Sequence, residues 1–165
     1  MIEALHEAVN ASGRALEKAK LAVRTLLLSD GKLSAAALDQ HQHQAHGLAW
    51  LATYVDTLKA LAAYAAKLSA QGKFGEIEQL LLKIACGEYL QQIAGGIPMN
   101  QTEIFRVENL GTDLKTLRSC DLYVEGNTRE NRARLVDLMQ EQQGELTFGN
   151  CGLDDTINDM RTSMQ

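Results

Sequence analysis

A histidine-rich run is the first place in this chain where residue types could do chemistry. Residues 40–46 read Gln-His-Gln-His-Gln-Ala-His. Metal ligands on one helix must share a face, and a spacing of three places His43 beside His46, whereas His41 lies roughly opposite His43. Two imidazoles without a nearby cysteine or carboxylate form an incomplete site. We therefore predict no metal here, and interpret the run as the polar, partly exposed start of a helix.

Other catalytic patterns are absent or incomplete. Glu3-Ala-Leu-His6 matches once the Glu-x-x-His motif that carboxylate-bridged di-iron bundles carry on two helices. The sequence has no Gly-x-Ser-x-Gly elbow and no Gly-x-x-x-x-Gly-Lys loop. The sequence places no base beside Cys86, Cys120 or Cys151. We interpret these cysteines as packing residues or free thiols of a reducing compartment.

A glycine pair stands at the end of an alanine- and leucine-rich segment. Residues 92–99 read Gln-Ile-Ala-Gly-Gly-Ile-Pro-Met. Because Gly95 and Gly96 lack a Cβ atom, another chain or a ligand could approach the backbone closely, and Gln92 could reach across from the last turn. On spacing alone, the simplest interpretation is the end of a helix.

Apolar periodicity predicts the long helices that would position these groups. A first helix over 2–28 carries an apolar stripe with alternating steps of three and four, and Asp30-Gly31 ends it. Ser34 is the predicted N-cap of a second long helix that ends near Leu68. A third helix over 76–94 is apolar on most sides, so we expect it at the centre of a bundle.

Capping signatures predict shorter helices in the second half of the chain. Asn100 with Glu103 favours a helix to about residue 110, and Asn127 with Glu130 favours one to about residue 143. No strand alternation is visible. We therefore predict an all-α helical bundle.

The chain is expected to have one bundle domain over 1–145. Within it, residues 112–120 form a further short helical segment. Residues 146–165 are interpreted as a linker and the start of a further domain, with a helix beginning within 153–164.

Composition and charge exclude several classes of function. Of the 165 residues, 45% are hydrophobic and 5% aromatic, which favours a folded helical domain over disorder or sheet. The net charge of -5, without clustered Lys or Arg, makes nucleic acid an unexpected partner. Charges interrupt the longest apolar stretches and the first turns, so we predict no membrane span, no signal peptide and a cytoplasmic location.

Three stretches occur in an order that matches a known family. Gln92 to Gly96 fits a Gln-x-x-Gly-Gly helix end. Residues 44–49, which lead into the alanine-rich 60–66, fit the helix before it, and 122–128 (Leu-Tyr-Val-Glu-Gly-Asn-Thr) is similar to an Ile-Tyr-Glu-Gly-Thr segment after it. Over about residues 24–139, the chain resembles the C-terminal bundle of the acyl-CoA dehydrogenase superfamily.

A narrower resemblance rests on two further features. The Gly-Gly-Ile-Pro-Met run over 95–99 and the tail from Gly152 are similar to the N-terminal helical extension of methylsuccinyl-CoA dehydrogenase-like members of the family. In those members the extension precedes a full dehydrogenase.

The resemblance implies a flavin contact. In the family, the Gln-x-x-Gly-Gly turn touches the ADP part of FAD bound by a neighbouring subunit, which assigns that contact to Gln92, Gly95 and Gly96. The chain departs from the family at Pro98 and Met99, where an aromatic residue and a glycine are usual. The family's Arg-x-x-Phe-Gly flavin contact is also missing. The resemblance thus implies FAD in a parent enzyme and no cofactor in this chain alone.

Glu125 is the nearest match to the glutamate that removes the acyl α-proton in many members. Val124 is inserted before it, and Asn127 separates Gly126 from Thr128. The family's acyl-CoA cleft is built from a helical and a β-domain that this sequence does not contain. Because a base without a positioned substrate does no catalysis, we expect no catalytic residue here and interpret Glu125 as a solvated residue before a helix cap.

Three functions follow as hypotheses. The first is a non-catalytic accessory or oligomerisation domain of an FAD-dependent acyl-CoA dehydrogenase, packed against downstream dehydrogenase domains. It predicts an exposed apolar patch and a homo-oligomer. The second is a binding module with a vestigial FAD or acyl-CoA site around 92–96. The third is an independent helical scaffold that binds no such ligand.

Overall fold

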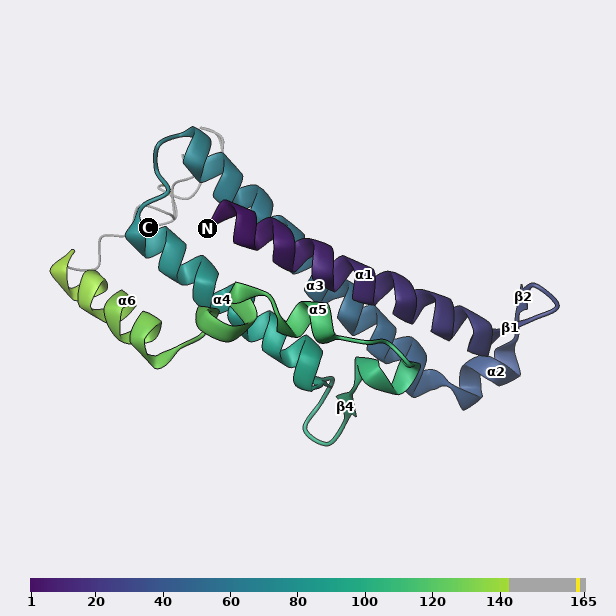
Figure 1. Ribbon diagram of the computed structural model, residues 1–165. Coiled ribbons are helices and arrows are strands. Elements are labelled where there is room, and N and C mark those ends of the chain that lie inside the picture. The colour runs from purple at the N-terminus through teal and green to yellow at the C-terminus, as the bar shows by residue number, and fades with distance from the viewer. Residues whose placement is uncertain (143–162, 164–165) are drawn as a thin grey trace.

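Three long helices form the framework of the computed structural model, which describes residues 1–142 and 163 (Figure 1). They are α1 (Ile2–Leu27), α3 (Gln42–Ala70) and α4 (Glu76–Gly95). α1 packs along α3, and α4 contacts both. A later helix, α6 (Arg129–Glu141), packs on α4. The predicted all-α bundle is confirmed.

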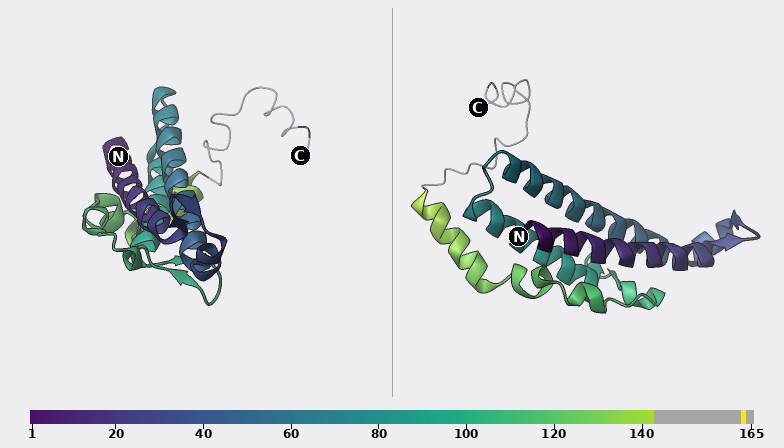
Figure 2. Two further views of the ribbon diagram at one scale, coloured as in Figure 1. Left: turned by 90° about the vertical axis from the view of Figure 1, so that its right-hand side faces the viewer. Right: turned by 45° about the horizontal axis from the view of Figure 1, so that its top comes forward.

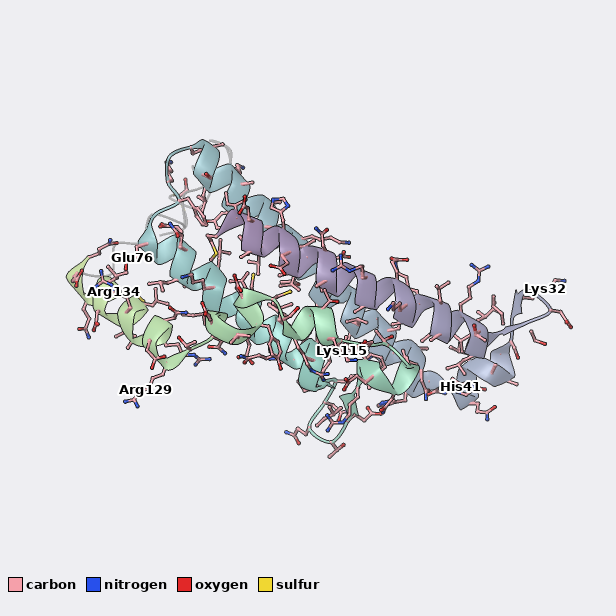
Figure 3. The ribbon with its side chains drawn as sticks, viewed as in Figure 1. Lys32, His41, Glu76, Lys115, Arg129 and Arg134 are labelled. Atoms are coloured by element: carbon pink, nitrogen blue, oxygen red, sulfur yellow. The ribbon has the colours of Figure 1, made fainter. Side chains whose placement is uncertain are left out.

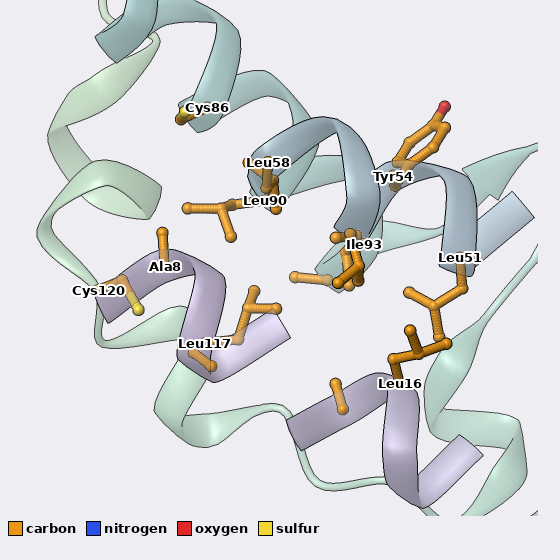
Figure 4. Close-up of a cluster of buried hydrophobic side chains, with 14 of the residues drawn as sticks. Ala8, Leu16, Leu51, Tyr54, Leu58, Cys86, Leu90, Ile93, Leu117 and Cys120 are labelled. Carbon is orange, nitrogen blue, oxygen red and sulfur yellow. The ribbon is translucent and has the colours of Figure 1, made fainter. Parts of the chain in front are cut away.

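The core lies between α1, α3 and α4 (Figure 4). Most of the stripe predicted for the first helix is buried, whereas its last member, Leu26, is exposed. Helices α3 and α4 supply leucines that meet the buried part. Fully or almost fully buried members are Leu5, Leu16, Leu51, Leu58, Leu90 and Ile93. Burying each such side chain stabilises the fold by about 1.5–3 kcal/mol.

Helix α4 is the central element, as its apolar character predicted. It contacts α1, α3 and α6, and two short elements also lie against it: α5 (Lys115–Arg118) and a wide π-type turn, η2 (Leu122–Gly126). Figure 2 shows α4 enclosed between the other helices. The π turn has no counterpart in the sequence-based prediction.

The second predicted helix is divided in two. Ser34 caps α2 (Ala35–Gln40) as expected, since its Oγ accepts a hydrogen bond from the Ala37 amide at 3.2 Å. The chain then leaves helical geometry at His41, and α3 begins at Gln42. No residue of α2 is buried. In proteins, tertiary packing stabilises a helix more than intrinsic propensity does. Because no α2 residue is buried, no packing holds α2 in line with α3.

A two-residue hairpin connects α1 to Ser34. β1 (Leu28–Ser29) pairs antiparallel with β2 (Lys32–Leu33), and these two-residue strands are too short to produce an alternating pattern in the sequence. Asp30 and Gly31 have φ of 51° and 76°. Positive φ at both central residues is the geometry of a tight hairpin turn, which Asp-Gly favours. The pair therefore ends the helix by turning the chain back.

The predicted helix over 100–110 was wrong. β3 (Ile97–Pro98) pairs with β4 (Ile104–Phe105), and only Val107–Leu110 forms a 3-10 helix, η1. The Asn100 carboxamide oxygen accepts from the amides of Thr102 and Glu103 at 2.9 and 3.0 Å. The same residue types that cap a helix here close a hairpin loop.

The last described helix begins one residue later than predicted. Thr128, and not Asn127, is the N-cap of α6, because its Oγ1 accepts from the Asn131 amide at 3.1 Å. Figure 3 shows Arg134 of α6 beside Glu76 of α4, where two hydrogen bonds of 2.9 and 3.0 Å tie the helices together. The predicted linker over 146–165 and helix over 153–164 lie outside the described residues apart from Ser163. None of the described helices is long and apolar enough to cross a membrane.

Candidate functional site: the end of helix α4

Gln92 is held by side chains from two helices. The Tyr54 hydroxyl of α3 donates to Gln92 Oε1 at 2.7 Å, and Gln92 Nε2 donates to Glu88 Oε1 at 2.7 Å. Tyr54 also meets the Tyr89 ring edge-on, with centroids 4.9 Å apart. Both ends of the Gln92 amide therefore have partners within the chain. A ligand that used this amide would have to displace Tyr54 or Glu88.

The hydrogen-bond chain continues from Glu88 to helix α6. Glu88 Oε2 accepts from the Asn127 side chain and lies 3.8 Å from an Arg132 guanidinium nitrogen. Arg132 Nε in turn donates to Asn127 Oδ1 at 2.6 Å. Burial, with Tyr89 and Glu88 nearby, raises the pKa of the Tyr54 hydroxyl. The network thus joins α3, α4 and α6 through one half-buried carboxylate.

Two arginines cap the C-terminal carbonyls of α4. Arg118 donates to the Ala94 carbonyl at 2.9 Å, and Arg106 donates to the Gly95 carbonyl. Arg118 also donates to Glu108 at 2.7 Å, and this hydrogen bond holds the pKa of Glu108 below its usual range. Cations placed on the last carbonyls of a helix interact favourably with its dipole.

The two glycines of the turn differ in what the chain requires of them. Gly96 has φ of 132°, and a Cβ atom there would lie 2.5 Å from Ile104 Cγ2, so its own fold demands glycine. Gly95 ends α4 without a positive φ, and a Cβ atom there would meet no atom within 4 Å. The fold itself therefore does not require glycine at position 95. Gly95 is also exposed; its carbonyl accepts from Arg106, but the space beside its Cα is open to a contact from outside the described residues.

Glu125 lies away from this turn. It is exposed and lines a cavity of about 420 Å³ with Gln79 and Lys83 of α4. Lys83 precedes Gln92 by nine residues, which places the two on opposite sides of α4 and about 13 Å apart along its axis. The structure does not bring the two predicted groups into one site. The interpretation of Glu125 as an exposed residue just before the α6 cap agrees with its position.

The histidines predicted to share a face have partners of different kinds. His46 Nε2 accepts from Trp50 Nε1 at 3.0 Å, whereas His43 Nδ1 lies 3.6 Å from a Glu103 carboxylate oxygen and packs near Phe105. Within residues 1–142 and 163, no three side chains of the His, Cys, Asp or Glu type are grouped to hold a metal ion.

Sequence reasoning missed the residues that surround the turn. Tyr54 lies 38 positions before Gln92, and Arg118 lies 24 positions after Ala94. No short motif connects positions so far apart. The one local signal is Arg106, a cation shortly after the glycine pair, where a helix C-terminus favours positive charge.

A comparison with known proteins identifies the relationship. The chain is 47% identical over 149 residues, or 88% of its length, to the (2S)-methylsuccinyl-CoA dehydrogenase of Cereibacter sphaeroides. The chain is therefore a relative of the acyl-CoA dehydrogenase superfamily. No family model matches it.

The match covers only part of that dehydrogenase. The chain spans 27% of the length of the relative, so most of the dehydrogenase lies outside the matched segment. The similarity confirms the resemblance to methylsuccinyl-CoA dehydrogenase-like members of the superfamily. The match alone does not show that this chain has the activity of the whole dehydrogenase.

Proposed function

We propose that this chain is a non-catalytic accessory domain of a flavin-dependent acyl-CoA dehydrogenase, in which it supports the assembly. The observation that carries the proposal is the 47% identity over 88% of the chain to a dehydrogenase of which it spans only 27%. A segment of that size, folded as a helical bundle, is suited to packing against other helical domains through its surface.

The geometry of the candidate residues supports a non-catalytic role. Catalysis by a base requires that the base and the substrate-positioning groups converge on one point. Glu125 lines a cavity beside Gln79 and Lys83, whereas the Gln92–Gly96 turn forms the C-terminal end of α4. In addition, Gln92 and the last carbonyls of α4 are engaged by Tyr54, Arg106 and Arg118.

The test begins with the native transcript beyond the codon for Gln165. The expected result is a continuing reading frame that encodes the remaining domains of a dehydrogenase. A stop codon at that point would overturn the accessory role. The longer protein is then compared with a version that lacks residues 1–145. We expect the shortened version to have a lower thermal stability than the longer protein and to lose the native oligomeric state.

A point substitution sharpens this test. In the longer protein, Glu125→Gln is expected to leave kcat unchanged, because the exposed Glu125 carboxylate lies outside any assembled site. General-base catalysis contributes roughly 10²–10⁴-fold to a rate, so a loss of that size would contradict the proposal. The matched control is Glu130→Gln, which changes another exposed carboxylate of the same region.

Room at Gly95 favours a second candidate function, a module that keeps a vestigial FAD or acyl-CoA site around residues 92–96. An exposed cation, Arg106, stands beside this glycine and suits a phosphate group. The Gln92 amide fits less well, because it is already bound by Tyr54 and Glu88. If FAD binds here, it supplies its own redox chemistry, while Gly95 and Arg106 hold only its ADP part.

Titration with FAD and with ADP tests the second candidate. The expected result is saturable heat of binding that is lost in Gln92→Ala and in Gly95→Ala. Gly95→Ala is the sharper variant, because a Cβ atom there disturbs nothing in the described chain. Gly13→Ala is the control, since it also adds a methyl group where no atom lies within 4 Å. Equal affinity in all three variants, or no binding, would refute the site.

A further inference from the structure

One end of the molecule is ordered but has no core of its own. No residue from Arg24 to His46 is buried, although this stretch is rich in leucine and alanine. It comprises the last turn of α1, the β1–β2 hairpin, α2 and the first turn of α3. We call residues 24–46 the apolar tip. Figures 1 and 3 show it projecting beyond the bundle at the end that carries Lys32.

Leucines of the apolar tip face solvent. Leu33 is 64% exposed, and Leu26 and Leu38 are each 37% exposed. α2 has no buried residue at all. Ordering a backbone costs about 1–2 kcal/mol per residue, and apolar burial is the main term that offsets this cost. A regular segment that fully buries none of its residues within the described chain is therefore suited to burial against another surface.

The charge of the apolar tip favours contact with an identical surface. Arg24 and Lys32 balance Asp30 and Asp39, so the tip carries no formal net charge, whereas the chain as a whole carries -5. At the tip two copies meet without net repulsion, and Lys32 of one copy can approach an aspartate of the other.

The position and size of the apolar tip also favour a second copy. The chain leaves α6 near Gln142, which lines a cavity with Gly72 at the α3–α4 turn. That turn lies at the far end of α3 from the tip, about 43 Å away for 29 residues. The described part of the chain thus leaves α6 at the end of the bundle opposite to the tip. Standard interfaces use roughly 20–30 residues a side, which is the length of the tip.

We infer that the apolar tip is a homotypic contact, through which two copies of this chain pair about a two-fold axis. The contact buries Leu33 and Leu38 of each copy against the other. The inference rests on the proposed assembly role and adds the surface and the partner to it. An isologous contact of this kind closes at two copies.

The test is sedimentation of the 165-residue chain over a wide concentration range. We expect a dimer that dissociates on dilution. The double variant Leu33→Glu with Leu38→Glu is expected to weaken the dimer at least about tenfold, or about 1.4 kcal/mol. Both side chains are exposed, so the helical circular dichroism signal should not change. Val124→Glu is the matched control, because Val124 is 62% exposed but lies in η2.

Three results would overturn the inference. The first is a wild-type chain that stays monomeric at the highest concentration. The second is an assembly that grows beyond two copies. The third is a dimer that survives in the Leu33 and Leu38 variant or is weakened equally by Val124→Glu.

The dimer and the accessory role can fail separately. A chain that dimerises through the apolar tip, but whose reading frame stops after Gln165, refutes the accessory role and keeps the contact. A continuing reading frame together with a monomeric chain refutes the contact and keeps the accessory role.

Discussion

Gly87 of α4 lies directly against Gly126 of η2, and neither position has room for a side chain. A Cβ atom at Gly87 would lie 2.5 Å from the Asn127 amide nitrogen, and one at Gly126 would lie 2.5 Å from the Lys83 carbonyl oxygen. Both obstacles are backbone atoms, which cannot rotate aside as a side chain can. This glycine pair sets how closely the π turn approaches the central helix.

The glycine contact predicts a large loss of stability in Gly87→Ala. The added methyl group must push η2 off α4, and overpacking of this kind costs about 1–3 kcal/mol or more. Urea denaturation followed by circular dichroism measures the change. Gly13→Ala in α1 is the control, because its Cβ atom would meet nothing within 4 Å. Alanine should stabilise that helix by roughly 0.5–1 kcal/mol. Equal effects of the two variants would contradict the packing argument.

A second prediction concerns Gly47 of α3 and Phe105 of β4. The buried Phe105 ring occupies the space that a Gly47 side chain would fill. We expect Gly47→Ala to destabilise the fold by about 1–3 kcal/mol and Phe105→Ala by about 3–5 kcal/mol. The double variant should cost less than the sum of the two, because the smaller residue at 105 admits the methyl group. A double-mutant cycle in urea provides the test, and strict additivity would refute direct contact.

A third prediction concerns the alkaline stability of the Tyr54 network. The pKa of Tyr54 is raised above the usual tyrosine value of 10.0, chiefly by burial. An unfolded chain therefore loses this proton before the folded chain does. The contribution of Tyr54 to stability is complete below about pH 10 and declines as pH rises through the folded-state pKa.

Tyr54→Phe isolates that contribution. At pH 8 the variant should lose about 0.5–1.5 kcal/mol, because the hydrogen bond to Gln92 is removed. Above pH 10 the difference between variant and wild type should shrink, since the wild type then has a proton to lose on unfolding. Urea denaturation at pH 8 and pH 11 checks both statements. A difference in stability between the two proteins that grows with pH would contradict this prediction.

A fourth prediction concerns the reactivity of the thiols. Cys86 and Cys120 are both free and fully buried, and burial raises the pKa of Cys86 to about 12 and that of Cys120 above its usual range. Reactive thiols are exposed thiolates, so both should be inert in the folded chain. In a Cys151→Ser background, Ellman's reagent at pH 8 should label neither thiol until denaturant is added. Rapid labelling of the native chain would reveal an opening of the core.

Local signals in the sequence predicted some elements well and others poorly. Ser34 was identified as a helix cap because capping is decided within one turn. Asn100 with Glu103 carries the same signal, yet it closes a hairpin, because Phe105 is drawn into the core over Gly47 and holds the strand extended. Cap and Asx turn use the same hydrogen bonds, so only tertiary contact chooses between them.

By itself, the sequence determined the helical class, the three long helices and the central place of α4. Each follows from the periodicity of apolar residues, which acts over a few turns and needs no knowledge of distant partners. Only the tertiary structure decided that Tyr54 and Glu88 bind Gln92, that Glu125 lines a cavity with Lys83 and not with the glycine turn, and that no residue from 24 to 46 is fully buried. Such relationships depend on how helices rotate and approach one another. That arrangement is set by close packing at contacts such as Gly87 with Gly126, between residues far apart in the chain.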